Sequence, residues 1–217
     1  DEFLQRYYSG EGLVALMDLY ETLGDNDALA MVGKAFEYHR DYYNTDKHPA
    51  SIPWLTQAYA RAWRVERRPE YADFIFKMND FIVSIQNQEL YPDKDHLGRF
   101  SSDEWSKIYG PPFAPSTGVY LEGVVDAYRV ARELKDVDRM EKYRIAIVLA
   151  CRSLMQLQFR DDNLFFAKDA FRTRGGIRGD VMSTTIRMDN VQHSMQGMLR
   201  AVQTLTRWDL PKKFWSM

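Results

Sequence analysis

The sequence contains a single cysteine, Cys151, among 217 residues. One thiol excludes both a disulfide framework and a thiolate metal cluster. Cys151 ends the longest apolar run, residues 145–151, which is far shorter than the roughly 18 to 20 apolar residues of a membrane-spanning helix. We therefore expect a soluble protein in which Cys151 is buried in the core and unreactive.

The sequence also lacks an excess of charge of either sign. Its formal net charge is -2 and its pI is about 6.1. Without a long basic run there is no electrostatic attraction toward nucleic acid or an anionic membrane. We expect no nucleic-acid partner and no membrane insertion, whereas a small anionic ligand remains compatible with this composition.

Motifs for nucleotides and metal ions are missing or incomplete. The glycine-rich segment 175–180 follows no strand pattern and lacks the lysine of a phosphate-binding loop. The histidines show neither HxH nor HExxH spacing. Residues 93–104 match a calcium-binding loop in part, but Leu97 replaces an oxygen ligand and Pro92 interrupts the entering helix. We therefore predict no metal ion and no cofactor.

The chain does contain a regular series of amphipathic segments. Apolar residues recur at helical spacing in seven of them, at residues 9–23, 25–43, 51–66, 69–86, 117–135, 138–157 and 189–205. Only residues 164–167 could form a short strand. The sequence predicts an all-α fold that forms a single domain over residues 1–217.

Capping patterns predict where several helices begin. The predicted N-caps are Asp25, Ser51, Asp138 (in a box with Glu141) and Asp189 or Asn190, and Pro69 is expected to open the fourth helix. The last helix carries an apolar stripe at Val191, Met195, Met198, Val202 and Leu205. This stripe predicts a helix that begins near residue 189.

The connections between these helices alternate in length. Those after the first, third and fifth helices are short, whereas residues 87–117 and 159–188 form two very long loops. Short connections predict antiparallel hairpins, and a stack of hairpins places all long loops on one face with the N-termini of alternate helices. We expect the functional site on that face.

Three stretches resemble the α/α-toroid superfamily that is often called six-hairpin glycosidase-like. They are YYSGEGL at residues 7–13, STGVYLEG at 116–123 and IRMDNVQH at 186–193. The resemblance implies inner and outer helices around a funnel, and action on carbohydrates as a glycoside hydrolase, a lyase or a sugar epimerase. Seven helices make three and a half hairpins, so we expect either the C-terminal part of a complete toroid or an open, incomplete array.

Four residues near the predicted inner N-termini are candidates for catalysis: Glu11, Glu122, Asp189 and His193. Paired carboxylates serve glycoside chemistry, and histidine titrates near neutral pH. Asp189 and His193 are four residues apart, so they share a helix face and could exchange protons. Asp103 and Glu104 in the first long loop are further carboxylate candidates. Alternatively, Asp189 only caps the helix and His193 only makes a structural hydrogen bond.

The candidates for substrate binding are Arg174, Arg178, Arg187, Trp105, Tyr109 and Gln192. Aromatic rings can stack on sugar faces, and guanidinium groups favour an acidic group such as a uronate. We therefore expect a carbohydrate-active or carbohydrate-binding protein. The alternative is a noncatalytic helical-repeat module that binds a peptide or a partner protein. The sequence leaves open whether the compartment is the cytoplasm or, after removal of a signal peptide, the periplasm or the exterior.

Overall fold

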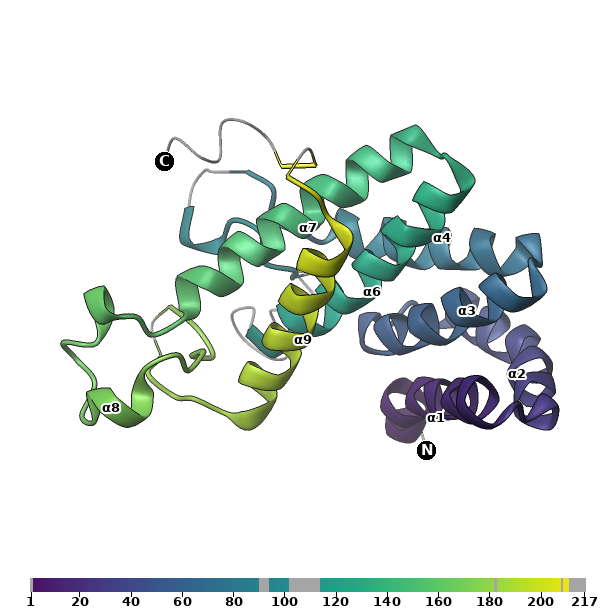
Figure 1. The fold of residues 1–217 in the computed structure, drawn as a ribbon, viewed down its shortest axis with the longest axis horizontal. Helices are drawn as coiled ribbons and strands as arrows, with labels where there is room; N and C mark the ends of the chain where they lie inside the picture. Colours follow the sequence, from purple (N-terminus) through teal and green to yellow (C-terminus); the bar gives the residue numbers. More distant parts are fainter. Residues whose placement is uncertain (1, 90–93, 102–113, 182, 208, 211–217) are drawn as a thin grey trace.

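The computed structural model describes residues 2–89, 94–101, 114–181, 183–207 and 209–210 (Figure 1). Within these ranges the secondary structure consists of α-helices, short 3-10 turns and isolated β-bridges. The prediction of an all-α protein is therefore confirmed. The short strand considered at residues 164–167 was wrong, because this segment continues a 3-10 turn into a hydrogen-bonded turn in which the amide of Ala167 donates to Leu164.

Seven long helices correspond to the seven predicted segments. They are α1 (Glu2–Leu23), α2 (Asn26–Thr45), α3 (Ile52–Glu66), α4 (Pro69–Ser84), α6 (Ala114–Leu134), α7 (Val137–Leu157) and α9 (Met188–Thr204). Shorter elements lie in the connections: η1 (Pro49–Ser51), η2 (Lys94–His96), η3 (Asp161–Asn163) and α8 (Ala170–Thr173). The first helix begins at Glu2 rather than at Ser9.

Each of the three helical hairpins reverses at a residue with positive φ. Gly24 follows α1 with φ 72°, Arg67 follows α3 with φ 56°, and Lys135 follows α6 with φ 59°. Left-handed residues at this position let backbone amides return to the last carbonyls of the helix. The amides of Gly24 and Arg67 do so, with bonds of 2.8 Å to Tyr20 and Trp63. The same local turn thus produces three antiparallel pairs.

These pairs arrange the helices in two rows (Figure 1). In one row α1 packs on α3, α3 on α6, and α6 on α9. The other row contains α2, α4 and α7, each packed against the helix that precedes it. The core lies between the rows, and its largest fully buried apolar side chains are Phe36, Tyr59, Tyr71, Phe100, Tyr128, Tyr143 and Phe159.

The capping predictions were right only in part. Asp25 caps α2 by accepting from the amides of Asp27 and Ala28, and Pro69 opens α4. Helix α7 is capped by Asp136, which accepts from the amide of Arg139, so the prediction of Asp138 was wrong.

Two other predicted caps also differ from the structure. Ser51 precedes α3 but makes no side-chain cap, because its hydroxyl donates back to the carbonyl of His48. The N-cap of α9 is Arg187, so Asp189 and Asn190 lie in the first turn.

The apolar stripe of α9 is buried only in part, because Val191, Met198 and Leu205 pack against the core whereas two of its members are exposed. Met195 is 57% exposed and Val202 is 77% exposed. The side of α9 that faces α6 is instead built from small or polar residues: Asn190, Ser194, Gly197, Ala201 and Thr204. Small side chains let the two helix backbones approach closely, whereas Met195 and Val202 lie on a side of α9 that faces away from this contact.

The two long loops contact one another. Arg99 in the first loop forms an ion pair with Asp180 in the second, with 2.5 Å between Nη1 and Oδ2, and both side chains are buried. Gln86 fixes the first loop by donating to the carbonyls of Gly98 and Ala146. The described parts of the loops are therefore held together, at the end of the helices where α7 stops and α9 begins (Figure 1).

Cys151 packs against the core, and burial raises the pKa of its thiol to about 12. The thiol therefore stays protonated at neutral pH, as expected for an unreactive cysteine. None of the described helices combines the length and apolar character that crossing a membrane requires.

Candidate functional site

Glu122 and His193 meet between α6 and α9. The Nδ1 atom of His193 lies 3.0 Å from Oε1 of Glu122, and their side chains are 17% and 4% exposed. An ionised carboxylate can only accept, so in that state Nδ1 carries the proton and donates it to Glu122. In a neutral ring Nε2 then holds a lone pair, which lets the histidine act as a base.

A third helix adds an aromatic ring to this pair. Trp54 of α3 contacts His193 edge to face, with 5.9 Å between ring centroids and an interplanar angle of 69°. Trp54 is only partly buried. The side chains of Trp54, Glu122 and His193 thus form a small site, called the α6–α9 site below, to which three adjacent helices contribute.

The geometry of this site depends on the close crossing of α6 and α9. A Cβ atom at Gly118 would lie 2.6 Å from the carbonyl carbon of His193 and 2.6 Å from the amide of Ser194. Gly197 provides a similar approach one turn later, because its Cβ would lie 2.9 Å from the carbonyl oxygen of Gly118. Glycines at this crossing hold His193 within hydrogen-bonding distance of Glu122.

Three buried polar side chains beside this crossing have no hydrogen-bond partner among the described residues. They are Thr117, Ser194 and Asn190, the last through both its amide oxygen and its amide nitrogen. An unpaired buried polar group costs about 1–3 kcal/mol. Such groups are rare in folded proteins and are typical of sites where water or a ligand completes the hydrogen bonds.

A network of charges continues from the α6–α9 site along the same helices. Asp126, one turn after Glu122, accepts from Arg200 at 2.8 Å and from Arg129 at 2.9 Å. Arg200 also donates to Gln57 of α3 at 2.7 Å. This network ties α3, α6 and α9 together and so fixes the positions of the residues in the site.

The structure pairs the predicted catalytic residues differently from the sequence interpretation. Asp189 does not join His193, because its carboxylate accepts from Arg187 at 3.0 and 2.7 Å. Glu11 is exposed on α1 and makes no hydrogen bond or ion pair with any described residue. Glu122 and His193 are thus the two candidates that the structure brings together.

The predicted binding residues lie in several places. Arg174 forms an ion pair with Asp161, and Gln192 is exposed on α9. Trp105, Tyr109, Asp103 and Glu104 lie outside the described residues. The guanidinium of Arg178 packs over two rings, 5.7 Å from the centroid of Phe159 and 5.8 Å from that of Phe166.

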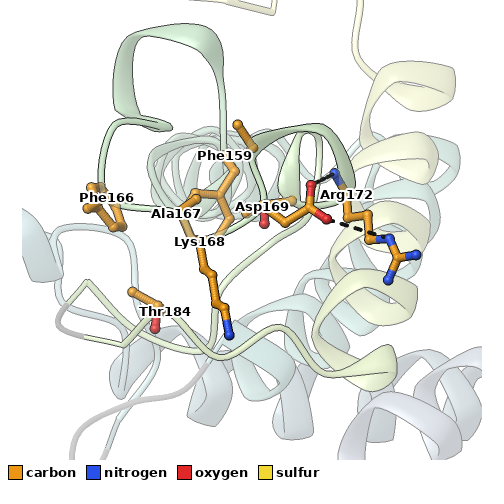
Figure 2. Close-up of a pocket in the computed structure, with 9 residues that line it drawn as sticks. Phe159, Phe166, Ala167, Lys168, Asp169, Arg172 and Thr184 are labelled. Carbon is orange, nitrogen blue, oxygen red and sulfur yellow. Dashed lines mark hydrogen bonds and ion pairs between the residues drawn. The ribbon is translucent and has the colours of Figure 1, made fainter.

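A cavity of about 820 Å³ lies within the second long loop (Figure 2). Its lining residues are Phe159, Phe166, Ala167, Lys168, Asp169, Ala170, Arg172, Thr173 and Thr184. The sequence interpretation missed this pocket, called the loop pocket below. Its only signal in the sequence is the segment 165–172 of the second long loop, which is rich in aromatic and charged residues.

No group of three or more His, Cys, Asp or Glu side chains is arranged for a metal ion within the described ranges. No family model, no curated protein and no solved structure matches this chain. Any function must therefore be inferred from the geometry of the two sites.

Proposed function

We propose that this protein is an open α/α-toroid array. It binds a carbohydrate at the α6–α9 site and catalyses a reaction of that sugar in which His193 accepts a proton. The observation that carries the proposal is the 3.0 Å contact between His193 Nδ1 and the buried Glu122 carboxylate. The two helix rows and the position of His193 in the second turn of α9, beside the first half of α6, support it.

The chemistry follows from the residues in the site. Nε2 of His193 takes a proton from the sugar or from water, and Glu122 orients the ring and stabilises the imidazolium that forms. Trp54 offers an apolar ring surface to the sugar. Because Asp189 is neutralised by Arg187, the described residues favour proton transfer by a histidine over hydrolysis by two carboxylates. A lyase or an epimerase therefore fits this site better than a two-carboxylate hydrolase.

The direct test measures melting temperature with a panel of neutral and acidic oligosaccharides. At a ligand concentration ten times Kd, binding should stabilise the fold by about 1.4 kcal/mol, which corresponds to a rise of roughly 3–6 °C. His193→Ala and Glu122→Gln should abolish turnover of the sugar that binds. Gln196→Ala, on the exposed side of the same helix, is the matched control and should behave like the wild type.

A panel in which no sugar stabilises the wild type would contradict carbohydrate binding. Turnover that survives His193→Ala would contradict the assigned role of the pair, even if sugars bind. The two results separate binding from chemistry.

A specific observation favours the alternative of a noncatalytic helical module. The exposed apolar residues Met188, Met195, Leu199 and Val202 follow one side of α9. An exposed apolar stripe of this kind can pack against the apolar face of an amphipathic peptide helix. The alternative predicts that a bound peptide is released by Met195→Glu but not by His193→Ala.

A further inference from the structure

The loop pocket differs from the α6–α9 site in its composition. None of its lining residues belongs to α6 or α9, and it lies wholly within the segment 159–184. Its volume of about 820 Å³ falls in the range of roughly 300–1,000 Å³ that is typical of small-molecule sites. The pocket is therefore large enough for a ligand of one or two rings.

Most arginines of this loop are paired with an acidic neighbour. Arg160 pairs with Asp162, Arg174 with Asp161, and Arg172 with Asp169 across the rim of the pocket (Figure 2). These exposed pairs satisfy one another, so they provide little net attraction for an anion.

Two cations of the loop have no acidic partner among the described residues, Lys168 and Arg178. Lys168 lines the pocket, and its side chain extends toward Thr184 (Figure 2). Arg178 packs over the rings of Phe159 and Phe166, and its Nε atom is buried without a hydrogen-bond acceptor. Neither positive charge is therefore neutralised by an ion pair among the described residues, because the Asp169 carboxylate that also lines the pocket is paired with Arg172.

One wall of the pocket is aromatic. Phe166 is 41% exposed, so part of its ring can contact a ligand, whereas Phe159 is buried and supports it at a centroid distance of 5.7 Å. On the rim, the carboxylate of Asp169 would repel a second negative group on the ligand. Arg172 beside it is 86% exposed and able to reorient.

We propose that the loop pocket binds a monovalent organic anion that combines a carboxylate with a six-membered ring. The carboxylate binds to the ammonium of Lys168 with help from the Thr184 hydroxyl, and the ring packs on Phe166. Arg178 acts through its charge and by holding the two phenylalanines. This assignment is independent of the function proposed for the α6–α9 site.

Saturation-transfer NMR with D-glucuronate, benzoate, D-glucose and acetate at constant ionic strength tests the proposal, because it detects weak binding. Ring protons of at least one ring acid should receive saturation, with affinity at least tenfold above that of acetate, and glucose should show none. Tighter binding of D-glucuronate would identify the preferred ring as a sugar, and tighter binding of benzoate would identify it as an aromatic group. Either result supports the assignment.

Variants assign that binding to residues. Lys168→Gln should lower the affinity for the ring acid at least tenfold, and Arg178→Gln should lower it by a smaller factor. Arg174→Gln, which removes an already paired charge from the same loop, should change the affinity less than twofold. His193→Ala should leave it unchanged, which separates this pocket from the α6–α9 site.

Three results would overturn the proposal. The first is no saturation of either ring acid, and the second is equal affinity for acetate, which would mean that the ring contributes nothing. The third is equal weakening by Lys168→Gln and Arg174→Gln, which would reflect only the net charge of the loop. Circular dichroism of each variant checks that the helices are intact.

Discussion

The α6–α9 site and the loop pocket differ in how their charges are neutralised. Between the helices, the carboxylates of Glu122 and Asp126 are buried, and each contacts a basic side chain of α9. In the second long loop, the ion pairs formed between two residues of the loop itself are exposed, and Lys168 and Arg178 have no acidic partner among the described residues. Paired buried charges fix geometry, whereas unpaired charges at a surface attract a ligand. The α6–α9 site is thus suited to holding catalytic side chains in fixed positions, and the loop pocket is suited to attracting a charged ligand.

The largest effect should come from the buried network of the α6–α9 region. Asp126→Ala leaves the guanidinium groups of Arg129 and Arg200 without their shared carboxylate. Removing one partner of a buried pair leaves the other charge uncompensated. We therefore expect a loss of about 3 kcal/mol in the free energy of unfolding, measured with urea.

Asp161→Ala is the matched control for this change, because it breaks the exposed pair with Arg174 in the loop. Its effect should stay below about 0.5 kcal/mol. Equal losses from the two variants would mean that the two regions do not differ in the way described above.

The close crossing of the helices gives the second prediction. Gly118→Ala places a methyl group 2.6 Å from backbone atoms of α9, which cannot move as a flexible side chain can. We expect a loss of about 2 kcal/mol and a change in the NMR signals of the His193 ring. Gly12→Ala in α1 is the control, because its Cβ meets nothing within 4 Å. That control should gain about 0.5–1 kcal/mol, and a similar gain from Gly118→Ala would contradict the close contact.

The acid sensitivity of folding gives the third prediction. Burial lowers the pKa of His39 from 6.5 to about 4. Between these values the unfolded chain binds a proton that the folded protein excludes, so stability falls as the pH drops through this window. At pH 5.5 the expected loss is about 1 kcal/mol relative to pH 7.5.

The measurement compares thermal unfolding of the wild type and His39→Phe at both pH values. Phenylalanine keeps the ring contacts with Tyr38 and Tyr59 but cannot titrate. The difference between the two pH values should shrink by about 1 kcal/mol in the variant. An unchanged difference would assign the acid sensitivity to another group.

Local signals in the sequence located the helices well. Asp25 and Pro69 mark helix starts because their preference is set by the adjacent backbone alone. Asp138 was predicted as the cap from its box with Glu141, but it lies in the first turn of α7, and only the geometry of the turn shows that the carboxylate of Asp136 reaches an amide. The left-handed turns at Arg67 and Lys135 gave no signal, since neither residue is glycine or asparagine.

The site was predictable as separate residues but not as a pair. Glu122 and His193 were both selected because they lie near helix N-termini, yet His193 was assigned to Asp189, which is four residues away on the same helix. Spacing within one helix is visible in a sequence, whereas the contact across α6 and α9 depends on Gly118 and Gly197. The carboxylate of Asp189 instead accepts a hydrogen bond from its near neighbour Arg187.

The smallest expected effect tests which side of α9 faces the protein. Hydrophobic periodicity alone treats Met195 and Met198 as equivalent members of a buried stripe. In the structure Met195 is 57% exposed, whereas Met198 packs against the core. Met195→Gln has nearly the same shape, so we expect a change of less than about 0.5 kcal/mol, and Met198→Gln should cost clearly more because it places an amide against apolar atoms. Equal losses above about 2 kcal/mol in urea titrations would mean that α9 is rotated about its axis. In that case Glu122 and His193 could not form their contact, and the α6–α9 site would not contain the buried pair that distinguishes it from the loop pocket.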